Sequence, residues 1–351
     1  MRGLLLGFSV LFYGCANTDD GGSDRVAAKI ERPSSVTAGR SFLRVLDSTV
    51  LDEPSEHPIV APSGMAVLSN GDLLIADASE GLLHRYSRDG RFAGVIGRRG
   101  DGPGEFRTPA YPFAGEDGSI YVVDLAKSQV VVFERDYSFK RTITFPAVSR
   151  IDQVAIDRAN RFWVLGNARD SKDDRVLTVA DSNGKAISAF IPIARLLPHG
   201  STDSLLWASS RRPSIAVGDS LVYVVSSLVD SIWTIEQTSL RLSARSLGHP
   251  MYRDPVPPTA QVQSRTDHRR WLESNILIAN VASVANFAIV GYSAGLYLNQ
   301  SNTLASLVAG DRIVYLDSVP PIITSTSEAF VQLATDGSGR HTLFRFSLVG
   351  R

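Results

Sequence analysis

The sequence contains a single cysteine, Cys15, so it cannot form an intramolecular disulfide bond. It also lacks an excess of either charge, because Lys plus Arg and Asp plus Glu each number 36 among 351 residues. A balanced charge gives no global attraction to nucleic acid or to an anionic membrane surface. Hydrophobic residues make up 44% of the chain, which is ample for a folded core.

The N-terminal apolar run, Gly3 to Tyr13, is shorter than the roughly 20 residues that a membrane-spanning helix requires. It follows the basic start Met1-Arg2 and precedes an abruptly polar stretch, which is the pattern of a secretory signal peptide. The sequence therefore predicts export from the cytoplasm.

Gly14-Cys15 resembles a bacterial lipobox, which implies that Cys15 is diacylated and becomes the mature N-terminus. Phe12 and Tyr13 depart from the usual residues of that motif, and the alternative is cleavage nearby that leaves a soluble secreted protein. Ala16 resembles the pattern that favours the outer membrane of the cell envelope. Residues 16–40 are rich in small and polar residues and are expected to form a flexible tether.

Short apolar runs recur along the rest of the chain. They end at Asp77, Asp124, Gly166, Ser226, Asn299 and Ala334, with the sequences LLIAD, IYVVD, FWVLG, LVYVVS, LYLN and FVQLA. Their separations are 47, 42, 60, 73 and 35 residues, and three of these match the length of a four-stranded propeller blade. We take these runs as the inner strands. The pattern predicts an all-β fold, a six-bladed β-propeller with insertions at the two long separations.

Turn residues support this division. Asn70-Gly71, Asp117-Gly118, Asn183-Gly184 and Gly218-Asp219 each lie between two apolar runs. Such pairs tolerate the positive φ angles that tight hairpins require.

We expect blades at about residues 60–98, 109–146, 151–192, 213–248 and 284–320, with the sixth at the C-terminus. The sixth blade is one strand short, and residues 41–49 (SFLRVLDST) are expected to supply that strand. The propeller domain then covers residues 41–351, and closing the ring removes the open sheet edge. Other divisions of blades 5 and 6 remain open.

Two insertions interrupt the β pattern. Residues 193–212 are expected to form a long loop, and residues 249–283 begin Pro-rich and continue with helical spacing of apolar residues. The spacing of Trp271, Leu272, Ile276 and Ala279 predicts a short helix that Thr266 or Asp267 could cap.

The stretch from Gly97 to Phe106, GRRGDGPGEF, followed by Pro109, resembles the NHL-repeat pattern of bacterial six-bladed propeller lipoproteins. The resemblance implies that this loop is mainly structural, and many members of that family have no assigned activity. Glycines in the loop permit a backbone path that is closed to other residues, and Phe106 can fill the space between blades. Asp77 and Asp124 are expected to accept backbone N–H bonds in the turns that follow them.

The same loop carries the candidate ligand-binding residues. It crosses from an outer strand to the next inner strand, on the face where propellers usually bind ligands. Arg98, Arg99, Glu105 and Arg107 could therefore line that face, although solvated rim charges are the simpler interpretation.

Catalytic and metal motifs are weak. Gly291 to Gly295 fits GxSxG, but an apolar strand rather than a helix follows Ser293, so a hairpin is expected; His199, His249 and His268 offer no distinctive base. The acidic residues Asp170, Asp173 and Asp174 lack the pattern of a calcium loop. Asp152, Asn286 and Asn299 are the weakest candidates for a cation over the central channel.

The sequence therefore favours a non-catalytic scaffold, a monomer anchored by lipid in the bacterial envelope. Its expected partner is a protein, peptide or glycan, and no cofactor, metal or nucleic acid is expected. The alternative is a lactonase-like hydrolase or lyase that requires one divalent cation. An RNA-binding NHL module that uses Arg98, Arg99 and Arg107 is disfavoured by export and by the zero net charge.

Overall fold

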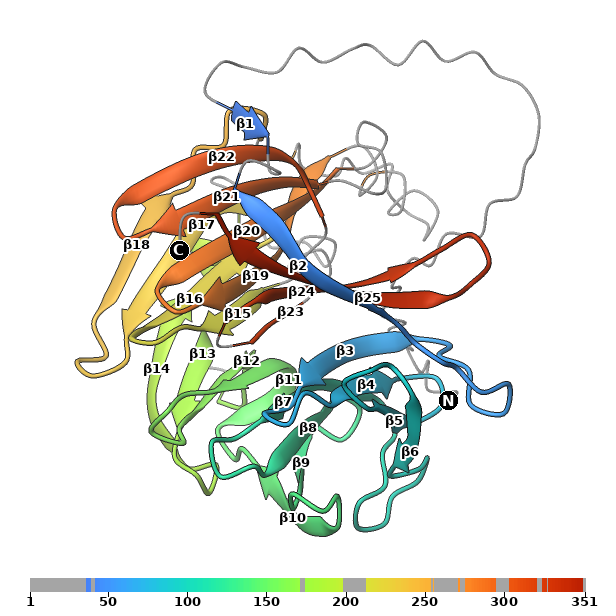
Figure 1. Ribbon diagram of the computed structural model, residues 1–351. Coiled ribbons are helices and arrows are strands. Elements are labelled where there is room, and N and C mark those ends of the chain that lie inside the picture. Colours follow the sequence, from blue (N-terminus) through green and yellow to red (C-terminus); the bar gives the residue numbers. More distant parts are fainter. Residues whose placement is uncertain are drawn as a thin grey trace.

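The chain forms six β-sheets that stand side by side around a common axis (Figure 1). The computed structural model describes residues 36–38, 42–170, 174–197, 213–253, 255, 271, 275–294, 303–320, 324–326 and 328–349. Each sheet is one blade, so the protein is the six-bladed β-propeller that the repeated apolar runs predict.

Blades 1 to 4 are antiparallel meanders of four strands each. Blade 1 contains β3 (Pro62–Val67), β4 (Leu73–Asp77), β5 (Leu82–Tyr86) and β6 (Phe92–Ile96). Blade 2 contains β7 (Pro109–Ala114), β8 (Ile120–Asp124), β9 (Gln129–Phe133) and β10 (Phe139–Thr144). Blade 3 contains β11 (Val148–Ile156), β12 (Phe162–Ala168), β13 (Arg175–Ala180) and β14 (Ala186–Pro192), followed by a 3-10 turn, η2 (Ile193–Leu196). Blade 4 contains β15 (Ser214–Val217), β16 (Leu221–Ser226), β17 (Val229–Glu236) and β18 (Leu242–Ser246).

Blades 5 and 6 each recruit a strand from the N-terminal part of the chain. Blade 5 contains β19 (Ile276–Val284), β20 (Phe287–Ala294), β21 (Thr303–Ala309) and β22 (Arg312–Val319), with β1 (Val36–Ala38) added parallel to β22. Blade 6 contains β23 (Thr324–Ser325), β24 (Phe330–Thr335) and β25 (His341–Leu348), with β2 (Leu43–Val50) as its outermost strand. Val36–Ala38 thus pairs with a blade although it lies in the segment expected to be a tether.

The first strand of every blade lies nearest the axis. These strands contact one another in the order β3, β7, β11, β15, β19, β23 and back to β3, which closes the ring. The approach between β3 and β7 is so close that a Cβ on Gly64 would lie 2.7 Å from the backbone nitrogen of Tyr111. Only glycine fits at that position.

The core consists of hydrophobic layers between neighbouring blades. Each of the six interfaces, from blade 1 against blade 2 round to blade 6 against blade 1, has its own cluster of buried apolar side chains. Strands β4 and β8 are buried at every residue because successive side chains point into the layers on opposite faces of the blade. This explains why these strands read as continuous apolar runs in the sequence.

The N-terminal strand closes the ring, as predicted. β2 pairs antiparallel with β25, from Leu43 opposite Leu348 to Val50 opposite Thr342 (Figure 1). Beyond β2, one carboxylate oxygen of Glu53 lies 2.7 Å from Nδ1 of His341, and the other accepts the backbone N–H of Ile59 at 3.2 Å. Ion pairing thus ties the segment that enters blade 1 to the C-terminal strand.

Two details of the predicted blades were wrong. The repeated apolar runs are the second strands of their blades, not the innermost ones, because the innermost strands have one edge toward the axis and are less uniformly apolar. In blade 5 the second strand is β20, earlier than the LYLN run, which lies outside the described residues. Blade 5 accordingly begins at Ile276 rather than at about residue 284.

The predicted helical insertion is also wrong at its C-terminal end. Residues 276–283 belong to β19, whose side chains pair along β20 and pack between blades 4 and 5, so the helical spacing of Ile276 and Ala279 was accidental. Trp271 is buried against Leu228 and Leu277. The residues between 256 and 270 lie outside the described part of the chain.

None of the helical segments in the described ranges is long and apolar enough to cross a membrane.

The Glu53–His341 pair should make ring closure sensitive to acid. Burial opposes ionisation of Glu53, but the hydrogen bond from His341 and the N–H of Ile59 outweigh it and lower the pKa of Glu53. A lowered folded-state pKa stabilises the fold above the ordinary value of 4.5, and this stabilisation is lost as the pH falls through the folded-state pKa. We expect Glu53→Gln to lower the melting temperature at pH 7. In acid, the melting temperatures of the variant and the wild type should become equal.

Thermal unfolding by circular dichroism at pH 7 and in acid measures this difference. Glu134→Gln, which removes a half-exposed partner of Lys140, is the matched control and should shift the melting temperature little. An equal shift for both variants at pH 7 would contradict a role of Glu53 in closure.

Candidate functional site

The crossover of residues 97–108 joins β6 of blade 1 to β7 of blade 2 and lies beside two strand-connecting turns. Arg99 donates to the carbonyl oxygens of Ser79 and Ala78 in the β4–β5 turn. Lys127 of the β8–β9 turn donates to the carbonyl oxygen of Glu105 at 2.9 Å. The crossover is therefore held against both blades that it connects.

Phe106 anchors this crossover. Its side chain is fully buried in the layer between blades 1 and 2, among Leu83 and Ile96 on one side and Val122 and Phe133 on the other. Gly97 has a φ of +73°, and a Cβ there would collide with the Phe106 ring. The expectation that Phe106 fills the space between blades is confirmed.

Two ion pairs stand on the solvent side of the anchored loop. The guanidinium of Arg98 lies 2.7 Å from Oε1 of Glu105, whose other oxygen accepts the N–H of Gly102 at 2.8 Å. Arg107 binds Asp101 with two parallel bonds of 2.6 Å. The side chains of Arg98, Arg107 and Asp101 are 81%, 59% and 63% exposed, so these charges form a presented surface.

The ion pairs keep the carboxylates of the loop charged. The N–H of Gly102, and then Arg98, lower the pKa of Glu105, while the hydrogen bond from Arg107 lowers the pKa of Asp101. The loop thus carries both signs of charge throughout the neutral pH range.

The structure brings together all four residues that the sequence nominated, Arg98, Arg99, Glu105 and Arg107. The Arg99 side chain donates to backbone carbonyl oxygens, including that of Arg107. Arg98, Glu105 and Arg107 instead take part in the two ion pairs on the solvent side of the loop. Sequence reasoning missed Asp101 and Lys127. Asp101 could have been found from its place in the same motif; Lys127 could not, because only the fold brings its turn to the crossover.

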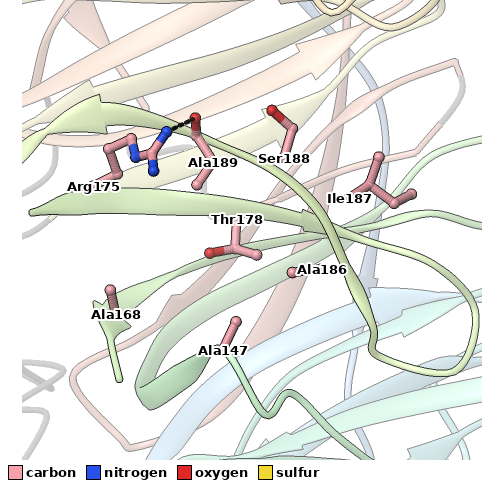
Figure 2. A pocket seen from close by; sticks show the side chains of 8 residues that line it. All are labelled: Ala147, Ala168, Arg175, Thr178, Ala186, Ile187, Ser188 and Ala189. Atoms are coloured by element: carbon pink, nitrogen blue, oxygen red, sulfur yellow. Dashed lines mark hydrogen bonds between the residues drawn. The ribbon is translucent and has the colours of Figure 1, made fainter. Parts of the chain in front are cut away.

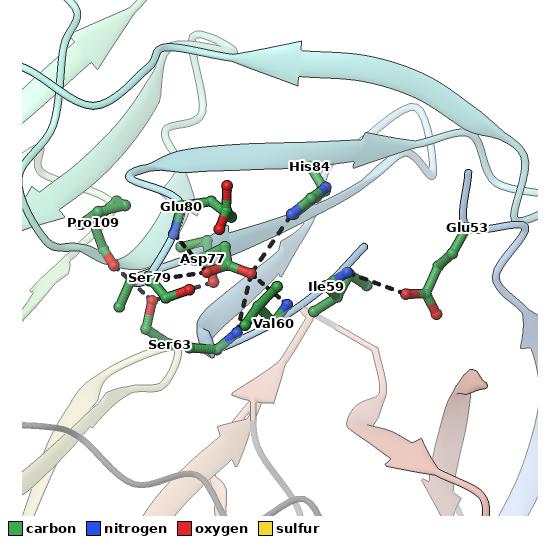
Figure 3. Close-up of polar contacts among 12 residues, drawn as sticks. Glu53, Ile59, Val60, Ser63, Asp77, Ser79, Glu80, His84 and Pro109 are labelled. Carbon is green, nitrogen blue, oxygen red and sulfur yellow. Dashed lines mark hydrogen bonds and ion pairs between the residues drawn. The ribbon is translucent and has the colours of Figure 1, made fainter. Parts of the chain in front are cut away.

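Asp77 sits at the centre of a buried polar network in blade 1 (Figure 3). Its Oδ1 accepts N–H bonds from Ser79 and Glu80 in the following turn, and its Oδ2 accepts those of Val60 and Ala61 just before β3. Burial opposes its ionisation, but His84 and these N–H groups lower the pKa of Asp77. The predicted turn capping is confirmed, and the same carboxylate also fixes the chain as it enters β3.

Asp124 repeats this arrangement in blade 2. Its carboxylate accepts the N–H groups of Arg107 at 2.8 Å and Thr108 at 3.2 Å, and that of Lys127 in the following turn at 3.3 Å. Asp124, at the end of β8, therefore fixes the backbone of Arg107 and Thr108 at the end of the candidate loop.

Polar side chains join neighbouring innermost strands around the axis. Ser63 donates to the carbonyl oxygen of Pro109 at 2.6 Å, Gln153 exchanges two bonds with the backbone of Ile215, and Ser214 accepts the N–H of Val281. These bonds satisfy backbone groups at the inner strand edges, which no further strand can pair.

The proposed cation candidates do not converge in the described structure. Asp152 pairs with Arg150 at 2.9 Å on β11, whereas Asn286 lies in the β19–β20 turn and accepts from Ser220 of blade 4. Asn299 lies outside the described residues, as does Asp173 of the acidic group. Within the described ranges, no group of three His, Cys, Asp or Glu side chains could hold a metal ion.

Ser293 of the GxSxG match lies in β20 opposite Leu277, in the antiparallel β19–β20 hairpin, as the sequence predicts. His249 is buried beside Tyr292 and Tyr315; it accepts the N–H of Met251 on Nδ1, and Nε2 lies 3.3 Å from the carbonyl oxygen of Leu316. Burial lowers the pKa of His249, which favours the neutral ring. Cys15, His199 and His268 lie outside the described residues.

The family follows from residues 41–246, which match the model of a family described as 6-bladed beta-propeller, DUF5128. The chain belongs to this family. The match contains the closing strand β2, the first four blades and the charged crossover of this DUF5128 propeller.

Solved structures share the fold of this DUF5128 propeller at low sequence identity. BF0058 from Bacteroides fragilis NCTC 9343, described as a “putative exported protein”, has a TM-score of 0.63 at 15% identity, over 89% of this chain and 97% of that one. A member of the DUF4221 family from Bacteroides vulgatus ATCC 8482 has a TM-score of 0.63 at 8% identity, over 88% and 99%. No curated protein matches the chain at a significant level.

Removing the Phe106 ring should release the crossover. Phe106→Ala leaves a cavity between blades 1 and 2 and is expected to destabilise the fold by about 3–5 kcal/mol. Urea unfolding measures the loss. Phe139→Ala, at a ring that is 38% exposed, is the matched control and should cost about 1 kcal/mol or less. Equal losses would show that Phe106 does not anchor the loop.

Proposed function

We propose that this protein is an exported binding scaffold of the bacterial envelope, and that the 97–108 crossover contacts a protein or peptide partner. The observation that carries the proposal is the exposed set of Arg98, Asp101 and Arg107, with the partly buried Glu105 paired to Arg98, on a loop whose base is buried. A rigid loop loses little conformational entropy on binding, so contacts made by its tip contribute more fully to affinity.

The arrangement of the charges favours a polypeptide partner. Exposed ion pairs contribute little to folding stability, but they can steer a partner of complementary charge and fix its orientation. Arginine and carboxylate side chains that alternate over one loop match the mixed charges of a protein surface.

Export and lipid attachment belong to the same proposal. They rest on the apolar run from Gly3 to Tyr13 and on Gly14-Cys15 after it. A lipid on Cys15 would place the propeller at a membrane surface through residues 16–35, which lead to the first described strand, β1, on the edge of blade 5.

Loss of the exposed arginines should weaken partner binding. The double substitution Arg98→Ala and Arg107→Ala is expected to reduce recovery of a cross-linked envelope partner at least about fivefold, while leaving the melting temperature nearly unchanged. Quantitative mass spectrometry after cross-linking in intact cells gives the ratio. Arg340→Ala, which removes an arginine that is 71% exposed and paired with Asp336, is the matched control. Equal recovery with the double variant would contradict the assigned surface.

Lipidation is tested separately. Cys15→Ser should move the protein from the membrane fraction to the soluble fraction and abolish incorporation of labelled palmitate. Membrane association and labelling that persist in the variant would refute a lipid on Cys15.

A further inference from the structure

A groove of about 380 Å³ lies on the outer half of blade 3, and its floor is made of small side chains (Figure 2). It is lined by Ala147, Ala168, Arg175, Thr178, Ala186, Ile187, Ser188 and Ala189. Ala147 belongs to the connection between blades 2 and 3, and the other residues belong to β12, β13 and β14. Thr178 pairs with Val164, whose side chain faces blade 2, so the groove opens at the blade 2–blade 3 interface.

The same place is filled between blades 1 and 2. Strand pairing is repeated there: Phe133 lies opposite Ile120 and Phe139, as Ala180 lies opposite Phe162 and Ala186. Phe133 and Phe139 of blade 2 therefore correspond to Ala180 and Ala186 of blade 3, and by the same register Val131 and Thr142 correspond to Thr178 and Ala189. Blade 3 therefore has alanine at two positions where blade 2 has phenylalanine, and it has Phe162 where blade 2 has Ile120.

The connection between blades 2 and 3 also differs from the one between blades 1 and 2. Between blades 1 and 2 the long crossover inserts Phe106, whose ring lies 5.8 Å from that of Phe133. Between blades 2 and 3 the connection is only residues 145–147, closed by a bond from the N–H of Val148 to the carbonyl oxygen of Phe145. The ring of Phe145 is buried in the layer between blades 2 and 3, 5.5 Å from that of Phe162, and Ala147 lines the groove.

Arg175 lines the groove itself, and a second arginine lies next to the groove residues Ala147 and Ala168. Arg169 directly follows Ala168 and donates to the carbonyl oxygens of Pro146 at 2.8 Å and Val148 at 3.3 Å. These bonds hold the guanidinium beside the connection, and no carboxylate among the described residues pairs with it. An acidic group on a ligand would therefore gain a charge-assisted hydrogen bond here.

We propose that this groove receives a bulky aromatic side chain of a partner polypeptide, with an adjacent acidic residue bound by Arg169. The ligand ring would cover the outer strands of blade 3, where Ala186 takes the place of Phe139 in blade 2. The crossover between blades 1 and 2 has the same pair of residue types, since Glu105 directly precedes Phe106. This inference rests on the proposed binding function and adds a second contact surface to it.

The test uses a fluorescent peptide, Gly-Pro-Gly-Glu-Phe-amide, which copies residues 102–106, and the full-length protein. Anisotropy should show saturable binding, which is lost when Phe in the peptide is replaced by Ala and weakened about two- to fivefold when Glu is replaced by Gln. Ala189→Phe fills the groove and should weaken binding at least about tenfold, and Arg169→Gln should match the Glu-to-Gln peptide. Leu242→Phe, on the outer strand of blade 4, is the matched control and should bind like wild type.

The peptide series gives a result even where a protein variant fails to fold. Absence of saturable binding, or binding that is indifferent to the aromatic residue or to Ala189→Phe, would overturn the inference. The Arg98→Ala and Arg107→Ala double variant should bind the peptide normally, because its loop lies at the other interface. If the peptide does not bind but the double variant still loses the cross-linked partner, the groove is rejected as a binding site and the proposed function stands. The opposite pattern would remove only the assigned loop.

Discussion

The whole structure depends on apolar side chains packing between neighbouring blades. No blade can bury both of its faces alone, and every face is covered only when six blades stand in a closed ring. The ring is closed by the pairing of β2 with β25, two segments from opposite ends of the described chain. The Glu53–His341 ion pair and the N–H bonds to Asp77 then fix the chain as it passes from the closing strand into blade 1.

The same constraint shapes the connections. A crossover must leave an outer strand, reach the next inner strand and cover the layer between two blades. Residues 97–108 meet all three needs through Phe106, and their outer surface is left to present ion pairs. Residues 145–147 insert the ring of Phe145 against Phe162, and the outer strands of blade 3 carry alanines where those of blade 2 carry phenylalanines. The two connections therefore cover their layers differently, and each leaves a different candidate binding surface.

Polar groups inside the protein serve structure. Asp77 and Asp124 cap turns and hold chain entrances, and Ser63, Gln153 and Ser214 join innermost strands. Exposed charges on the crossover contribute little to this framework, and their value lies in recognition. The distinction between a buried base and a presented tip is what supports a binding role for the loop.

Much of this protein could be inferred from local sequence. The blade number and the roles of Phe106, Asp77 and Asp124 follow from strand runs, turn residues and the crossover motif, because each depends on neighbours close in the chain. The closing strand follows from counting, because the sixth blade is one strand short and residues 41–49 belong to no other hairpin. The start of blade 5 could not be predicted from the sequence, because Ile276 and Ala279 also fit a helical spacing. Only the pairing of β19 with β20 shows that these residues form a strand. Only the tertiary structure decided which strand lies innermost, that Lys127 contacts the candidate loop, and that a groove opens beside Thr178. Those features depend on side chains brought together by packing between blades, and no local pattern in the sequence records that packing.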